Sequence, residues 1–458
     1  MRPATSRRAQ WAAAALVLLI GAAAPRSLPA EDSPPPKAPV PPSPFLPVIY
    51  RYADAMLAKG RDELGPMKTG LFLSVLDRAA PGPLAARPRL PGGLKDEDRP
   101  GGASGPPAYA CPEHDQNLLR VLYTLSELSA KPVYKEAADA EIRRLFEESA
   151  GPWTAWDTLR DAAVPRAGAQ VAPFRPWLLW DRAFDLAPSR CAQLAAGLAE
   201  AGSSAASMRD AGFRIRALAV AHARTGEARF LKAIEDILGA AESKARADAP
   251  LASRLSLAID CDGAAHRVPG PLAARLRAMA DREDDVFCGI HHDVAATGGF
   301  LVETGESANR PAARTPLWET HMGSPTTAQV ALLCVSRYEN TGKVAYRELI
   351  HAAAEAYLAS LPPEDLDAWP GTFGHAIGLQ LAAWRSTAKQ VFLDRARKLG
   401  DVALERFFDG SPLPRASLRS EHYETITGAD TLALALVDLH LHILHITAVR
   451  CPPLSADR

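Results

Sequence analysis

The chain has 458 residues, of which 47% are hydrophobic and 23% charged, with 39 prolines and a formal net charge of −1. This composition is that of a globular protein, and the near-neutral charge excludes the basic stripe of a nucleic-acid binder, so we expect no nucleic-acid partner. Six cysteines in this length exclude a disulfide scaffold, and the sequence contains no Cys-x-x-Cys pair of the kind that indicates structural zinc.

The N-terminus predicts export. Arginines precede an apolar run over 11–24 that is too short and too rich in small residues for a membrane span. A plausible cleavage site follows, so we predict a signal peptide over 1–30, a secreted or periplasmic protein and no membrane span in the mature chain. Cleavage would remove four arginines and no acidic residue, changing the net charge from −1 to −5. An uncleaved N-terminal membrane anchor is the alternative.

Proline marks the start of the folded body. Eight prolines between positions 34 and 47 exclude a helix or a sheet ladder and predict an extended linker over 31–47. We expect a single domain over 48–450, with an irregular loop rich in Pro and Gly at 79–112 and a short tail at 451–458.

The body is predicted to be all-α, because long Ala- and Leu-rich segments carry apolar residues three and four positions apart. In four places a Ser or Thr is followed five residues later by an aromatic residue. This pattern predicts a helix end, a tight turn, and an aromatic side chain that enters the core at the start of the next helix. The four pairs are Ser129/Tyr134, Thr225/Phe230, Thr341/Tyr346 and Thr387/Phe392.

The repeated turns indicate a repeat architecture. The Ser/Thr positions are 96, 116 and 46 residues apart, which suggests a unit of roughly 48 residues and further hairpins around 177–202 and 251–282. Repeated hairpins with a Thr-Gly-x-x-x-aromatic turn, as at 225–230 and 341–346, resemble the (α/α)6 toroid with its inner and outer helix rings. The resemblance implies a carbohydrate-active enzyme, since glycosidases, polysaccharide lyases and sugar epimerases share this fold, but it matches no single family.

The starts of the inner helices are candidates for a site. If the repeated turns share one end of a toroid, positions fifteen residues before each turn share the other end, and these are His114, Asp210, Thr326 and Thr372. The neighbouring sequences are polar and aromatic, and free N–H groups at helix starts attract carboxylates. We therefore predict that the clusters converge on a carbohydrate polymer or oligosaccharide. N-capping explains each cluster taken singly.

Among the two chain-cleaving chemistries, a lyase is preferred because His and Tyr outnumber clear carboxylate pairs. A lyase would neutralise a uronate carboxylate with His422 or Arg419 and remove the C5 proton with Tyr423, His321 or His375.

A glycoside hydrolase is the first alternative, with Glu319, Glu424 and Asp285 as candidate carboxylates. A non-catalytic toroid that binds glycan or protein, and a sugar epimerase, are further alternatives. The predicted substrate-binding residues are His114, Trp318, Trp369, His292, His422 and Asp285.

No cofactor is expected. A divalent metal at His291, His292 and Asp293 is a weaker possibility, because neighbouring residues on a loop have no preset ligand geometry. Cys261 and Cys288 are candidates for a disulfide in an oxidising compartment, although buried thiols explain them equally well.

Overall fold

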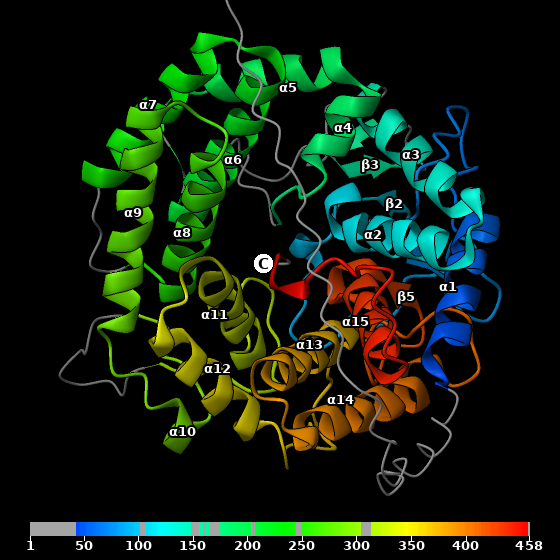
Figure 1. Ribbon diagram of the computed structural model, residues 1–458. Coiled ribbons are helices and arrows are strands. Elements are labelled where there is room, and N and C mark those ends of the chain that lie inside the picture. Colours follow the sequence, from blue (N-terminus) through cyan, green and yellow to red (C-terminus); the bar gives the residue numbers. More distant parts are fainter. Residues whose placement is uncertain are drawn as a thin grey trace, which may run out of the picture. The chain divides into compact units, whose positions relative to one another are not determined.

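A computed structural model describes residues 43–100, 107–147, 155–158, 162–164, 175–202, 205, 207–243, 249–303 and 313–456 (Figure 1). The predicted signal peptide and most of the predicted linker lie outside these residues. From Pro42 onward the chain forms one compact unit. Across the described ranges, no helix is long and apolar enough to cross a membrane.

Six long helices form an inner ring, which is seen end-on in Figure 1. They are α2 (Pro112–Ser129), α6 (Met208–Thr225), α8 (Leu251–Ala265), α11 (Thr327–Thr341), α13 (Pro370–Thr387) and α15 (Ala429–Ile443). Each packs against an outer helix, in the same order α3 (Pro132–Glu147), α7 (Ala228–Ser243), α9 (Gly270–Cys288), α12 (Val344–Ala356), α14 (Gln390–Ala403) and α1 (Phe45–Lys59).

A shorter pair, α4 (Trp180–Leu186) and α5 (Pro188–Glu200), connects the α2–α3 hairpin to α6 and α7. The predicted all-α toroid with inner and outer rings is therefore confirmed. The hairpins expected around 177–202 and 251–282 are α4–α5 and α8–α9.

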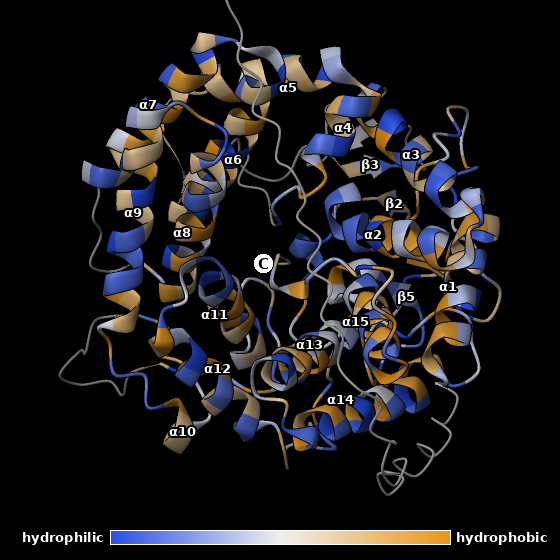
Figure 2. Cartoon of the chain, in the orientation of Figure 1, coloured by the Kyte–Doolittle hydropathy of each residue, from blue (hydrophilic) through white to orange (hydrophobic). Residues whose placement is uncertain are grey.

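The two rings differ in how they are buried. In α13 every residue from Pro370 to Ala383 is buried, because an inner helix has neighbours on all sides. The outer helix α14 buries Phe392, Ala396, Leu399 and Ala403, spaced three or four residues apart, and exposes its other face to water. Figure 2 shows this two-sidedness as alternating blue and orange along α14.

The four repeated turns are built alike, and they explain the sequence pattern. Each Ser or Thr hydroxyl donates to the carbonyl four residues earlier, at 2.7–2.9 Å, and accepts the N–H two residues later, at 3.2–3.3 Å. The intervening residue is left-handed, with φ of 55° to 74° at Ala130, Gly226, Gly342 and Ala388. The aromatic residues that follow are at most 2% exposed, as predicted.

Short strands adjoin the starts of two inner helices. β1 (Val75–Leu76) pairs antiparallel with β5 (Tyr423–Glu424), which joins the N-terminal part of the unit to the segment before α15. β2 (Tyr109–Ala110), directly before α2, pairs with β3 (Ala155–Asp157), which pairs with β4 (Ala162–Val164).

The predicted tail is part of the fold. After α15 the chain returns to the ring centre, where the C-terminus is marked in Figure 1. A 3-10 turn at Leu454–Ala456 packs against α11, α13 and α15. Leu454 is 4% exposed, and a Cβ on Gly378 of α13 would lie only 2.8 Å from its side chain. Gly378 therefore makes room for Leu454.

Candidate active site

A cavity of about 200 Å³ lies where the starts of α8, α11 and α13 meet the segment before α15. Its polar lining consists of two arginines, two histidines, a glutamine and several Ser and Thr hydroxyl groups. No carboxylate is among the described residues that line it. Of the predicted site residues, His321, His375 and Trp369 belong to the lining.

His321 lies on a tight turn at the cavity rim. Its carbonyl accepts the N–H of Ser324 at 3.0 Å. Its Nε2 lies 3.0 Å from Oε1 of Glu319, and both side chains are more than half exposed. Glu319 thus contacts His321 at the rim but does not itself line the cavity.

The irregular loop positions this turn. The carbonyl of Gly93 accepts the N–H of Met322 at 3.1 Å. Gly93 has φ of 81°, and a Cβ there would lie 1.9 Å from the carbonyl oxygen of Thr320. Only glycine permits this backbone contact, so Gly93 fixes the turn next to His321.

Trp369 and His375 come from the start of α13. The Trp369 indole N–H donates to the carbonyl of Gly92 at 2.8 Å, and His375 follows in the second turn of the helix. Gly371 and Gly374 let this helix start contact the start of α15 directly, because a Cβ on either would lie 2.9 Å from backbone atoms there. Two small residues three positions apart therefore bring His375 close to the segment before α15.

Glu424 is the centre of a buried ion-pair network. Its carboxylate accepts from Arg99 Nε and Nη2 at 2.7 and 2.6 Å, from His422 Nε2 at 2.8 Å and from the Tyr109 hydroxyl at 3.2 Å. Burial would raise the pKa of Glu424, but the hydrogen bonds from His422 and Arg99 outweigh it and lower that pKa. An acid held in its charged form is poorly suited to donate a proton.

The Tyr423 side chain contacts Tyr52 and is not part of the Glu424 ion-pair network. Its hydroxyl lies 2.9 Å from the Tyr52 hydroxyl, and burial, with Tyr52 and Asp115 nearby, raises the pKa of Tyr423 well above its usual value. Tyr423 is fully buried and is not among the residues that line the cavity. This position does not suit Tyr423 for the predicted role of catalytic base.

Two buried carboxyl groups, Asp115 and Asp430, lie at the starts of α2 and α15. Asp430 accepts the backbone N–H groups of Asn117 and Thr431 at 3.0 and 2.8 Å. Asp115 accepts the Ser74 hydroxyl at 2.8 Å, and burial together with the nearby Asp430 charge raises the pKa of Asp115 well above its usual value. Burial and the nearby Asp430 thus favour the protonated form of Asp115.

His114 is buried beside Arg175, which lines the cavity. Arg175 Nη1 donates to the carbonyl of His114 at 3.3 Å and lies 3.6 Å from Asp430 Oδ1. Burial, reinforced by the Arg175 charge, lowers the pKa of His114 to about 3, so its imidazole is neutral at physiological pH. His114 therefore adjoins the cavity through Arg175, which is part of the lining. The segment that contains Glu424 reaches the cavity through Ile426 and Thr427.

Two predicted binding residues lie away from the cavity lining. Trp318 is 3% exposed and packs in the core against Tyr357 and Phe373, with its indole N–H donating to Ser360 at 2.8 Å. Asp285 is exposed and lies 3.3 Å from Lys343. Neither position brings the side chain to the cavity.

His292, a member of the predicted metal site at 291–293, forms hydrogen bonds to the backbone through both ring nitrogens. Its Nε2 donates to the Phe287 carbonyl at 3.1 Å, and its Nδ1 accepts the Leu301 N–H at 3.3 Å. Burial lowers the pKa of His292 to about 4. With both ring nitrogens engaged, this histidine offers no lone pair to a metal. Cys261 and Cys288, the candidate disulfide, are both free thiols.

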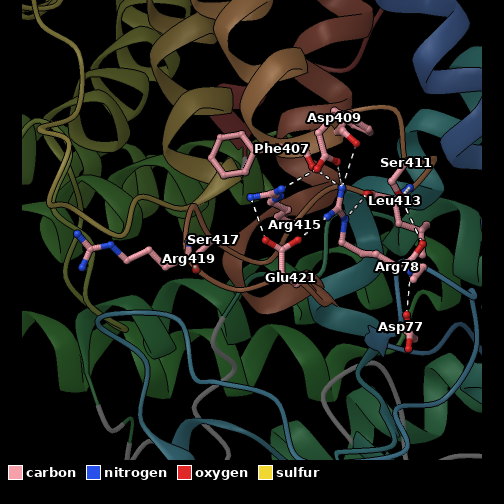
Figure 3. Close-up of polar contacts among 12 residues, drawn as sticks. Asp77, Arg78, Phe407, Asp409, Ser411, Leu413, Arg415, Ser417, Arg419 and Glu421 are labelled. Atoms are coloured by element: carbon pink, nitrogen blue, oxygen red, sulfur yellow. Dashed lines mark hydrogen bonds and ion pairs between the residues drawn. The ribbon is translucent and has the colours of Figure 1, made fainter.

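Arg78 anchors the segment that leads to Glu424 (Figure 3). This buried guanidinium donates to the carbonyls of Leu413 at 2.7 Å and Phe407 at 3.0 Å, and it pairs with Asp409 and Glu421. Arg419, the predicted neutralising group, is exposed and points away from this cluster in Figure 3.

The residues predicted for the site did not include Arg99, Arg175 or Asp430. Arg99 and Arg175 lie in irregular segments without periodicity, so nothing local indicates their partners. Asp430 offered a usable signal, because an acidic residue in the first turn of a helix is favoured by the helix dipole.

No protein-family model matches the chain, and a search of curated proteins found no match. Similar solved structures include a D-mannose isomerase, at 9% identity over 87% of this chain and 97% of that chain, with a TM-score of 0.48. A family 76 glycoside hydrolase (mannosidase) from Bacteroides thetaiotaomicron is 9% identical over 87% of this chain and 99% of that chain, with a TM-score of 0.46. A sugar epimerase from a ruminal bacterium is 9% identical over 84% of this chain and 97% of that chain, also with a TM-score of 0.46. The fold assignment rests on the helices of this chain, not on these likenesses.

Proposed function

We propose that this protein is a carbohydrate-active enzyme that works by proton transfer between histidine side chains and a sugar. The observation that carries the proposal is that His321 and His375 line one cavity whose described lining holds no carboxylate. Imidazole changes its charge near neutral pH and is the side chain most often used for general acid–base catalysis.

The rest of the lining suits a sugar. Hydroxyl groups of Ser253, Ser256 and Thr372 offer hydrogen bonds to sugar hydroxyls, and Trp369 and Ile426 offer apolar surface to the C–H faces of a ring. Arg175 and Arg209 add positive charge to the wall, which suits a carboxylate or a developing enolate.

Proton transfer fits two reaction classes, both of which remove a proton from carbon next to a carbonyl or carboxylate. An epimerase or isomerase returns the proton, whereas a lyase eliminates the neighbouring glycosidic oxygen. Glycoside hydrolysis, the remaining class, uses two carboxylates on either side of the bond. Glu319 lies at the rim, and Glu424 is occupied by Arg99 and His422, so we favour proton transfer. From the N-terminal sequence alone, we also propose that the protein acts outside the cytoplasm.

The proposal is tested by incubating the purified protein with a panel of monosaccharides, oligosaccharides and uronate polysaccharides. Ultraviolet absorbance of an unsaturated product indicates a lyase, and an isomerised sugar without chain cleavage indicates an epimerase or isomerase. We expect His375→Ala to lower either activity by about 100-fold or more, and His351→Ala, on the outer helix α12, to leave it unchanged. New reducing ends alone, unaffected by His321→Ala and His375→Ala, would overturn the proposal. Absence of turnover on the whole panel would do the same and favour the non-catalytic alternative.

A further inference from the structure

Cys111, Glu113 and His114 form a compact cluster of three donors at the start of α2. The Cys111 sulfur, a Glu113 carboxylate oxygen and a His114 ring nitrogen all lie within 4.8 Å of one another. All three residues are at most 1% exposed. The proposed function uses none of these side chains, and the inference drawn from them does not depend on it.

We propose that this cluster is a zinc site at the start of α2, with three protein ligands and water in the fourth position. Thiolate, imidazole and carboxylate are the three donor types that zinc accepts, whereas calcium and magnesium select oxygen donors alone. Zinc–ligand distances of about 2.0–2.3 Å in a tetrahedron place donor atoms about 3.5 Å apart. The donor atoms of the cluster lie within 4.8 Å of one another, at most about 1.3 Å beyond that spacing.

The charges of the three donor types suit a divalent cation. A thiolate and a carboxylate together balance the two charges of zinc, so the loaded site would be neutral in a buried environment where an unbalanced charge is costly. The neutral imidazole is the form that binds metals.

The backbone around the cluster is already fixed. The Cys111 N–H donates to the Ser74 hydroxyl at 2.7 Å, and the His114 N–H donates to the Cys111 carbonyl at 2.8 Å. The His114 carbonyl in turn accepts from Arg175, which lines the cavity. A metal here would therefore hold one wall of the cavity from its buried side.

The test uses the tag-free protein after removal of metals with a chelator. Zinc is added, excess is removed by dialysis, and bound zinc is measured by elemental mass spectrometry, with one equivalent per chain expected. Cobalt(II) is then used as a spectroscopic probe, because a thiolate ligand produces a charge-transfer band and tetrahedral geometry gives intense visible bands. Absence of a stoichiometric ion, or of the thiolate band, in the wild-type protein would overturn the proposal.

Variants assign the band to this cluster. We expect Cys111→Ser to abolish the charge-transfer band and Glu113→Gln to weaken cobalt binding by at least tenfold. The matched controls are Cys288→Ser and Cys451→Ser, which alter the two less buried cysteines and should leave the band intact. A band that survives Cys111→Ser, or binding unchanged in Glu113→Gln, would contradict the assignment. Should Cys111→Ser fail to fold, Glu113→Gln, which keeps the side-chain size, decides the question.

Discussion

Nε2 of His321 lies 3.0 Å from a carboxylate oxygen of Glu319 at the rim of the cavity. A carboxylate in this position holds the imidazole in a fixed orientation. We expect Glu319→Gln to lower kcat about tenfold with little change in KM, because the pair is exposed and water partly replaces it. Glu355→Gln, on the outer helix α12, is the control. Steady-state kinetics in which kcat is unchanged by Glu319→Gln would show that the pair plays no part.

The Arg99–Glu424 ion pair is expected to be a sensitive polar contact of the fold. Both side chains are at most 2% exposed, so Arg99→Met leaves a buried carboxylate with less compensation and should destabilise the protein by about 3–5 kcal/mol. In a Glu424→Gln background the same substitution should cost much less. Denaturant unfolding of the two single variants and the double variant measures this coupling, and additive effects would contradict it.

The same glutamate predicts an acid dependence. Because the folded-state pKa of Glu424 lies below its ordinary 4.5, its contribution to stability is present above pH 4.5 and is lost as the pH falls through the folded-state pKa. The Glu424→Gln variant should therefore lose stability less steeply than the wild type below pH 4.5. Thermal unfolding of both proteins over a pH series checks this. Melting temperatures of the wild type and the variant that fall in parallel with pH would contradict it.

Asp115 predicts a dependence of the opposite sign. Its pKa is raised, so the stability gained from its protonated form is complete below its ordinary pKa of 3.8 and is lost as the pH rises towards the folded-state pKa. Asp115→Asn resembles the protonated acid in shape and cannot ionise. We expect it to gain stability relative to the wild type as the pH is raised above 3.8, in the same thermal series. A difference that does not change with pH would contradict this assignment.

The repeated turns offer a stability test with internal controls. Ala130 and Ala388 occupy the left-handed position that Gly226 and Gly342 occupy in the other copies, and a Cβ is disfavoured there. Ala388→Gly should stabilise the protein by about 0.5–1 kcal/mol, and Gly342→Ala should destabilise it by a similar amount. Urea unfolding midpoints of the two variants measure these effects. A loss of stability in Ala388→Gly would contradict the left-handed conformation of this residue.

How far the sequence predicted the fold depends on how local each signal is. The Ser/Thr hydroxyl, the left-handed residue and the buried aromatic of each turn act within ten residues, so the pattern at Thr341 and Tyr346 suffices to place a hairpin. The fifteen-residue offset then located the helix starts, because the inner helices have similar lengths.

The site was less predictable because its contacts join distant segments. Arg99 and Glu424 are 325 residues apart and meet only when the ring closes. Trp318 and Trp369 both precede inner helices in similar polar sequence, yet one packs in the core and the other lines the cavity. Their roles depend on packing between hairpins, which no local pattern specifies.

The most direct test of the central claim is solvent deuterium exchange at carbon. The wild-type protein is incubated in heavy water with the sugar that it turns over, and deuterium incorporation next to the carbonyl or carboxylate is followed by NMR. For an epimerase or isomerase we predict incorporation at the reacting carbon of the product. For a lyase we predict exchange at that carbon in the remaining substrate, because the unsaturated product carries no hydrogen there. Either signal should fall by about 100-fold in His375→Ala and stay unchanged in His351→Ala. Turnover with no carbon-bound deuterium in either species, together with full activity of His375→Ala, would contradict proton transfer by the two histidines.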